Sequence, residues 1–126
     1  MIGTKGERRL LVTSEVVVNF LGMDEARVLS TPHMIGVMER TCRDTVLPLL
    51  EPGHDTVGTH IEVWHLAAAP IGAAVTFRVE VTAVDGRRIH FRVEAWNETE
   101  KVGEGTHERA TINVAKFASR LAARKK

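Results

Sequence analysis

The chain has 126 residues, of which 44% are hydrophobic and 26% are charged, a composition typical of one globular domain with a substantial core. Its 17 basic and 16 acidic residues leave a formal net charge of +1, without the basic excess of most nucleic-acid-binding proteins. The sequence therefore predicts a single domain over residues 1–126 and no nucleic-acid partner.

Cysteine usage and hydropathy indicate where the protein works. Cys42 is the only cysteine, so no internal disulfide can form and a reducing compartment is favoured. Residues 1–20 lack the apolar run of a signal peptide, and no stretch of about 18 apolar residues predicts a membrane span. We expect a soluble, cytoplasmic protein with no membrane partner.

The N-terminal part of the chain predicts two short elements. Residues 8–12 are typical of a strand, and residues 15–21 are typical of a short helix that Thr13 or Ser14 caps and Gly22 ends. The connector that follows, residues 23–29, is short and charged and contains no aromatic side chain.

Residues 30–50 predict one long helix. Ser30 or Thr31 can cap its start, Pro32 suits its first turn, and Pro48 is expected to loosen its last turn. Apolar side chains recur every three or four residues, which predicts a stripe that lies against a sheet. The stripe consists of Met34, Val37, Met38, Thr41, Cys42, Thr45 and Leu49.

Glu39 lies at the border of this stripe and admits two interpretations. A carboxylate at the edge of a buried face needs a partner, because an unpaired buried charge is costly. Arg43, one turn further along the helix, could form a structural ion pair with it. Alternatively, Glu39 could serve a reaction.

Strands dominate the second half of the chain. In residues 56–67 the odd positions from Thr59 to His65 share the more apolar face, and His60 lies on the other face. Asp85-Gly86 predicts a tight hairpin, and the basic residues 115–126 predict a terminal helix or tail. The predicted strands are residues 56–67, 73–83, 89–95 and 102–114.

This element order predicts an α+β fold with an antiparallel five-stranded sheet against one long helix. Two known architectures match it: the hot-dog fold, in which the sheet wraps a central helix, and the cone-like fold of ketosteroid isomerases. The cone-like fold places more helix ahead of its sheet, so the hot-dog fold is favoured. Trp64 and Trp96 on the outer face suggest that the protein is a dimer.

Several chemistries lack support. No glycine-rich dinucleotide or phosphate-binding motif is present. His60 and His65 point to opposite faces of one strand, which is poor geometry for a metal, so we expect no metal. Cys42 lies in the middle of an apolar stripe, where an inert thiol is more typical than a nucleophile.

The remaining motifs carry a resemblance to a known family. Their order and spacing resemble the hot-dog thioesterases related to fluoroacetyl-coenzyme A thioesterase, over nearly the whole chain from the long helix onward. The segments are Ser30-Thr31, Met34 to Glu39, Val57-Gly58-Thr59, His65 to Gly72, Val84 to Arg88, and Gly103 to Arg109.

The resemblance implies a homodimeric hydrolase of acyl-coenzyme A thioesters. Thr31, Glu39 and His65 would be the catalytic residues, and Gly58 and Arg109 would contact the thioester. Coenzyme A would enter as part of the substrate, with no separate cofactor. Fluoroacetyl-specific members carry a longer lid with aromatic side chains before the helix, so a different short acyl group is expected here.

Each assignment also has a structural interpretation. Thr31 could cap the helix, His65 could be a hydrogen-bonded core histidine, and Gly58 could mark a bulge. Arg109 could pair with Glu108 or Glu104 across the sheet.

Two further alternatives concern the protein as a whole and its hairpin tip. A non-catalytic binding module for acyl-coenzyme A or another hydrophobic ligand could share this fold, and an isomerase or hydratase would require the cone-like fold. Arg87 and Arg88 at the hairpin tip could meet coenzyme A phosphates or face solvent.

Overall fold

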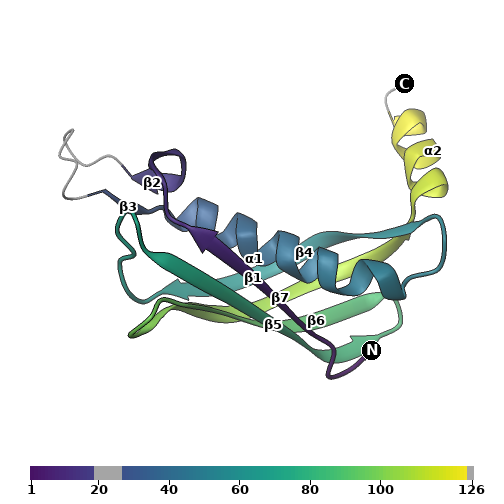
Figure 1. Cartoon of the computed structure of the whole chain (residues 1–126). Coiled ribbons are helices and arrows are strands. Elements are labelled where there is room, and N and C mark those ends of the chain that lie inside the picture. Colours follow the sequence, from purple (N-terminus) through teal and green to yellow (C-terminus); the bar gives the residue numbers. More distant parts are fainter. Residues whose placement is uncertain (19–26, 125–126) are drawn as a thin grey trace.

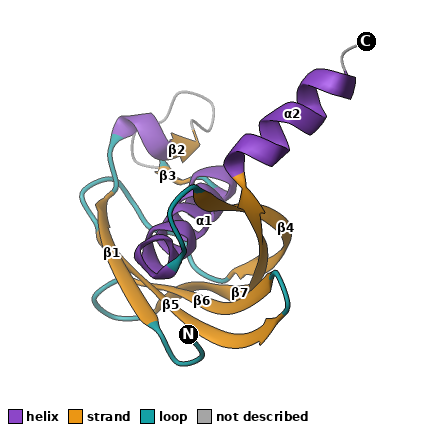
Figure 2. Ribbon diagram, turned by 90° about the vertical axis from the view of Figure 1, so that its right-hand side faces the viewer, coloured by secondary structure: helices purple, strands orange, loops and turns teal. Residues whose placement is uncertain are grey.

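The computed structural model describes residues 1–18 and 27–124. A five-stranded antiparallel sheet in the order β1-β5-β6-β7-β4 forms most of the molecule. Its concave face curls around one long helix, α1, as Figures 1 and 2 show. The strands are β1 (Lys5–Leu11), β4 (His54–His65), β5 (Ala74–Asp85), β6 (Arg88–Trp96) and β7 (Lys101–Asn113).

The helix α1 (Thr31–Val46) begins and ends for reasons visible in the sequence. Ser30 is the N-cap, and its side chain accepts a hydrogen bond from the backbone N–H of His33. Pro48 falls in a 3-10 turn, η3 (Leu47–Leu49), so the last predicted turn is tighter than an α-helix. Leu49 in this turn is exposed, whereas Val46, the last residue of α1 and four residues after Cys42, is buried.

The core lies between α1 and the concave face of the sheet. The predicted strands at 73–83 and 89–95 are confirmed as β5 and β6, and alternate residues of both strands are buried against α1. These buried residues are Val75, Phe77, Val79, Val81, Ile89, Phe91, Val93 and Ala95. Gly86 turns the hairpin between these strands with a φ of 59°, a conformation that favours glycine. The largest fully buried side chains include Phe77, Phe91, Leu29, Met34, Met38 and Ile89.

Strand β4 contains a bulge that changes which residues face α1. Gly58 pairs with Arg109 and His60 pairs with Glu108, so Thr59 is the extra residue. The predicted bulge at Gly58 is therefore confirmed. The expectation that Thr59 shares the helix-facing side is wrong, because its hydroxyl donates at 2.5 Å to the carboxylate of Glu108, a residue on the opposite face of the sheet from His107 and Arg109.

The region before α1 differs from the prediction. The hydroxyl of Thr13 accepts a hydrogen bond at a helical start as expected, but only the 3-10 turn η1 (Ser14–Val16) follows. Strand β2 (Val17–Val18) then pairs with β3 (Val28–Leu29), so a helix over 15–21 is wrong where the chain is described. Consecutive valines favour extended backbone, which explains the difference. The rest of that helix, Gly22, and residues 23–26 of the connector lie outside the described residues.

The sheet edges and the C-terminus complete the fold. Strand β4 is an edge strand, and Trp64 on it is 56% exposed, whereas Trp96 on β6 is partly covered by Lys101. The last residues form a helix, α2 (Val114–Arg124), which projects away from the sheet in Figure 2 and buries no side chain. No helix in the described ranges has the length and apolar character needed to span a membrane.

Candidate functional site

The first pair of predicted site residues meets where α1 begins. The Thr31 hydroxyl lies 2.7 Å from His65 Nδ1, at the end of β4. Thr31 does not cap the helix, because Ser30 performs that role. The hydroxyl of Thr31 is therefore available to position the imidazole.

The other ring nitrogen of His65 is buried without a partner. Nε2 has no hydrogen bond, although buried polar atoms in proteins are nearly always satisfied. Burial also lowers the pKa of His65, which favours a neutral imidazole. A neutral ring held at Nδ1 with an unpaired Nε2 is suited to exchange a proton with a bound molecule.

Glu39 does not form the ion pair with Arg43 that a structural interpretation predicts. Arg43 instead forms a bidentate pair with Asp55, at 2.7 and 3.0 Å. Glu39 Oε2 lies 4.0 Å from Arg109 Nη1, and its side chain is 41% exposed. The carboxylate is thus next to one buried cation and still reachable from solvent.

Arg109 lies inside the molecule rather than pairing with Glu108 or Glu104. Its side chain is 7% exposed, and burial lowers the pKa of its guanidinium. It donates to the Thr56 hydroxyl at 2.6 Å and to the Thr56 carbonyl at 2.9 Å. These bonds direct Nη1 towards Glu39.

His107 completes this network, and the sequence analysis did not propose it as a site residue. Its Nδ1 lies 2.7 Å from the His60 carbonyl, and its Nε2 lies 3.2 Å from Arg109 Nη1. A carbonyl only accepts and a guanidinium only donates, so the ring is neutral, with its proton on Nδ1. Burial lowers the pKa of His107 as well. Side chains alternate between the two faces of a strand, so the sequence of β7 indicates that His107 and Arg109 share a face. That pattern could have identified His107 as a site residue.

Gly58 lies beside these groups and leaves space there. A Cβ atom at this position would come within 3.0 Å of Glu39 Oε2 and 3.3 Å of His107 Cε1. The absence of a side chain therefore keeps a narrow space open between the carboxylate and the strand.

Cys42 is close to the same charges but is unsuited to nucleophilic chemistry. Burial raises the pKa of its thiol to about 12. A thiol that stays protonated at neutral pH is a poor nucleophile, which agrees with the prediction of an inert core cysteine.

The five predicted residues thus form two groups within one chain. Thr31 and His65 form one group, and Glu39, Gly58 and Arg109 form the other. Across the described ranges, no hydrogen bond or ion pair joins the groups. Thr31 and Glu39 are eight positions apart in the sequence, which corresponds to about 12 Å along a helix.

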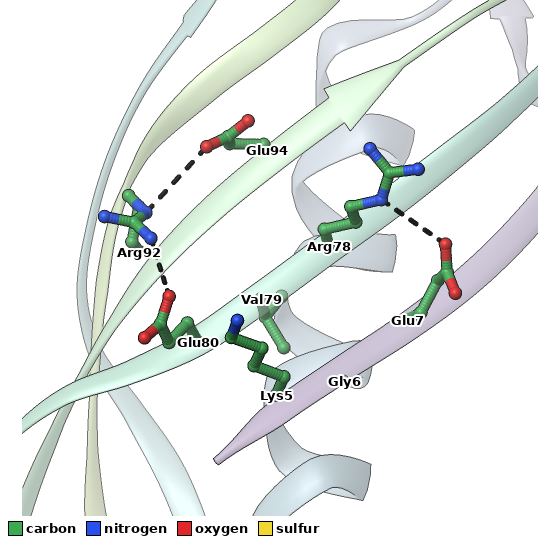
Figure 3. A pocket seen from close by; sticks show the side chains of 8 residues that line it. All are labelled: Lys5, Gly6, Glu7, Arg78, Val79, Glu80, Arg92 and Glu94. Carbon is green, nitrogen blue, oxygen red and sulfur yellow. Dashed lines mark hydrogen bonds and ion pairs between the residues drawn. The ribbon is translucent and has the colours of Figure 1, made fainter. Parts of the chain in front are cut away.

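A hollow on the outer face of the sheet has a different character. It measures about 440 Å³ and lies over β1, β5 and β6. Each of its carboxylates pairs with an arginine, as the dashed lines in Figure 3 show. The pairs are Glu7 with Arg78, and Glu80 and Glu94 with Arg92. Its charges are largely neutralised, so it offers no comparable chemical site.

Known proteins share this fold and sequence pattern. A family model described as "Fluoroacetyl-CoA-specific thioesterase" matches residues 12–115. The fluoroacetyl-CoA thioesterase of Streptantibioticus cattleyicolor is 44% identical over 94 residues, which cover 75% of this chain and 68% of that protein.

Solved structures agree with this match. A structure of the fluoroacetyl-CoA thioesterase FlK has a TM-score of 0.86 at 35% identity, covering 98% of this chain and 96% of that one. A thioesterase superfamily member from Thermus thermophilus has a TM-score of 0.88 at 31% identity, covering 99% and 93% of the two chains. A hot-dog-like protein from Thermanaerovibrio acidaminovorans has a TM-score of 0.89 at 26% identity, covering 98% and 91%.

The fold and these matches define the protein as a hot-dog α+β domain, and the predicted fold class is confirmed. The chain belongs to the fluoroacetyl-CoA-specific thioesterase family and is an acyl-CoA thioester hydrolase.

Proposed function

We propose that the protein hydrolyses a short acyl-coenzyme A thioester to the free acid and coenzyme A, with Glu39, His65 and Thr31 as its catalytic residues. The observation that carries this proposal is the place of Glu39, a solvent-reachable carboxylate beside Gly58 and the buried Arg109. Family membership makes a thioester the appropriate substrate.

The roles follow from the chemistry of thioester hydrolysis. Glu39 attacks the carbonyl carbon or deprotonates the attacking water. His65, held by Thr31, supplies a proton from Nε2 to the leaving thiolate. The open space at Gly58 admits the carbonyl, and Arg109 stabilises negative charge on its oxygen.

We further propose that two chains form a homodimer through β4, which would bring the two groups together. An unpaired edge strand of 12 residues carrying an exposed Trp64 is a surface that proteins normally cover. Antiparallel pairing of β4 with its copy about a two-fold axis places the His65 end of one strand towards Gly58 of the other. Each site would then combine Glu39 of one subunit with His65 of the partner subunit.

The acyl group is proposed to be short. The relative in Streptantibioticus cattleyicolor is named for fluoroacetyl-CoA, which carries a short acyl group. Recognition through an aromatic lid is not expected, because residues 23–29 contain no aromatic side chain.

Release of free thiol from a panel of acyl-coenzyme A esters tests the function. The panel contains acetyl, fluoroacetyl, propionyl and benzoyl esters. We expect turnover of the shortest esters and a loss of roughly a hundredfold or more in kcat for Glu39→Gln or His65→Ala, as for general acid–base residues.

Two results would contradict this proposal in different ways. If the wild-type protein binds coenzyme A but cleaves no ester, the protein is a non-catalytic binding module. If both variants retain full activity, the residue assignment is wrong although the enzyme class stands.

A further inference from the structure

A second hollow, of about 420 Å³, lies where β4 begins and β7 ends. It is bordered by the start of β4, the β5–β6 hairpin, the end of β7 and one side of α2. The residues that matter for its chemistry are His54, Arg87, Asn113, Lys116 and Arg120.

The charges in this hollow have one sign. Three cations line it, namely Arg87, Lys116 and Arg120, and no carboxylate does. Within the described part of the chain, none of the three side chains has a hydrogen bond or ion pair. The outer-face hollow of Figure 3 is the opposite case, because its arginines are paired with glutamates. Cations gathered without a counter-ion attract an anion of several charges.

The backbone around the hollow is anchored, although the cationic side chains are exposed. The N–H of Val114 donates to the Gly53 carbonyl at 3.0 Å, which attaches the start of α2 to the turn before β4. The Asn113 side chain accepts from the Lys116 N–H at 3.1 Å and caps α2. The Thr111 N–H donates to the Arg87 carbonyl at 2.8 Å, which holds the hairpin tip.

The hollow lies in line with the proposed catalytic groups. Gly58 pairs with Arg109, and His54 pairs with Asn113 at the end of the same two strands. The two pairs are four positions apart on each strand, which is about 13 Å. Residues an even number apart on a strand share a face, so the hollow and Gly58 open on the helix-facing side.

We propose that this hollow binds the phosphate groups of the coenzyme A moiety while the thioester lies at Gly58 and Glu39. The proposal rests on the proposed function and adds Lys116, Arg120 and His54 to substrate recognition. It also gives the hairpin-tip Arg87 a phosphate-binding role. The extended pantetheine arm of coenzyme A connects the two places.

A binding measurement tests the anion site without any reaction. The probe is adenosine 3′,5′-bisphosphate, titrated calorimetrically into the wild type, the double variant Lys116→Ala/Arg120→Ala, and Arg124→Ala. The control, Arg124→Ala, removes a charge from the same helix but outside the hollow. We expect the double variant to weaken binding roughly tenfold or more and the control to change it less than about twofold, because charge-assisted hydrogen bonds are lost only in the former.

Kinetics on two substrates tests whether the site serves catalysis. Acetyl-coenzyme A carries the phosphates and acetyl-pantetheine does not. We expect the double variant, and Arg87→Ala on the separate hairpin, to raise KM for acetyl-coenzyme A while leaving acetyl-pantetheine turnover unchanged.

The two experiments distinguish a failure of the proposed phosphate site from a failure of the proposed thioesterase function. The phosphate site is wrong if the double variant and the control bind adenosine 3′,5′-bisphosphate with equal affinity. It is also wrong if the substitutions raise KM equally for acetyl-coenzyme A and acetyl-pantetheine. If no ester is cleaved, the proposed function fails, and the bisphosphate titration still decides whether the anion site exists. Circular dichroism of each variant verifies that the fold is retained.

Discussion

At the scale of single residues, His107 is the feature with the clearest energetic consequence. It is buried, and it bridges the His60 carbonyl and the Arg109 guanidinium with one donor and one acceptor. His107→Leu leaves both partners unsatisfied, so the free energy of unfolding should fall by about 1–3 kcal/mol. His107→Gln retains a donor and an acceptor and should lose less. Urea unfolding at pH 7.5 measures both changes, and equal losses would show that the hydrogen bonds are unimportant.

The same histidine gives stability a dependence on pH. Burial lowers the pKa of His65 and of His107, so below the ordinary histidine value of 6.5 the unfolded chain binds more protons. This contribution to stability is fully present above that value and is lost as pH falls through the lowered pKa values. We expect the unfolding free energy to decrease between pH 7 and pH 5, and less steeply in His107→Gln. An identical slope in that variant would show that His107 does not contribute.

The site could be predicted from the sequence only in part. The resemblance named Glu39, Gly58 and Arg109, and the structure places them side by side. His107 was missed because a histidine on a strand is usually structural, and its place on the same face as Arg109 was not used. Its hydrogen bond with Arg109 assigns it to the site. The ion pair of Arg43 with Asp55 was missed because it joins residues on different elements.

At the scale of elements, the start of α1 separates a structural residue from a proposed catalytic one. Ser30 caps the helix, whereas Thr31 bonds to His65. Ser30→Ala should lower the unfolding free energy by about 1 kcal/mol, as for other lost N-caps. Thr31→Val should reduce kcat and leave helix capping intact. Unfolding assays measure the stability of both variants, and thiol-release assays measure their kcat. A loss of kcat without a loss of stability in Ser30→Ala, or a loss of stability without a loss of kcat in Thr31→Val, would contradict these roles.

The strands were predicted more accurately than the N-terminal region. Alternation of buried and exposed positions in β5 and β6 is set by local chemistry, so the sequence alone identifies it. The extra residue Thr59 reverses which residues of β4 face α1; the glycine at position 58 indicated a bulge, but not which residue would be the extra one. Val17 and Val18 pair with Leu29 and Val28, residues of another strand that local helix propensity does not reveal as partners.

At the scale of the whole molecule, the proposed active site requires two chains. One chain holds Thr31 with His65 and, separately, Glu39 with Arg109. Pairing through β4 is the arrangement that would unite them, and sedimentation of the protein should show a dimer. The sequence predicted a dimer from Trp64, Trp96 and the family resemblance, whereas the choice of β4 as the proposed interface follows from its place at the edge of the sheet.

Complementation between two inactive variants tests the central claim most directly. Chains carrying Glu39→Gln and chains carrying His65→Ala are given different affinity tags, co-expressed, and purified as the mixed dimer. If each site uses Glu39 of one subunit and His65 of the other, one of two sites is intact, and thiol release should return to about half the wild-type rate per dimer. A mixed dimer as inactive as either parent would contradict a site shared between subunits.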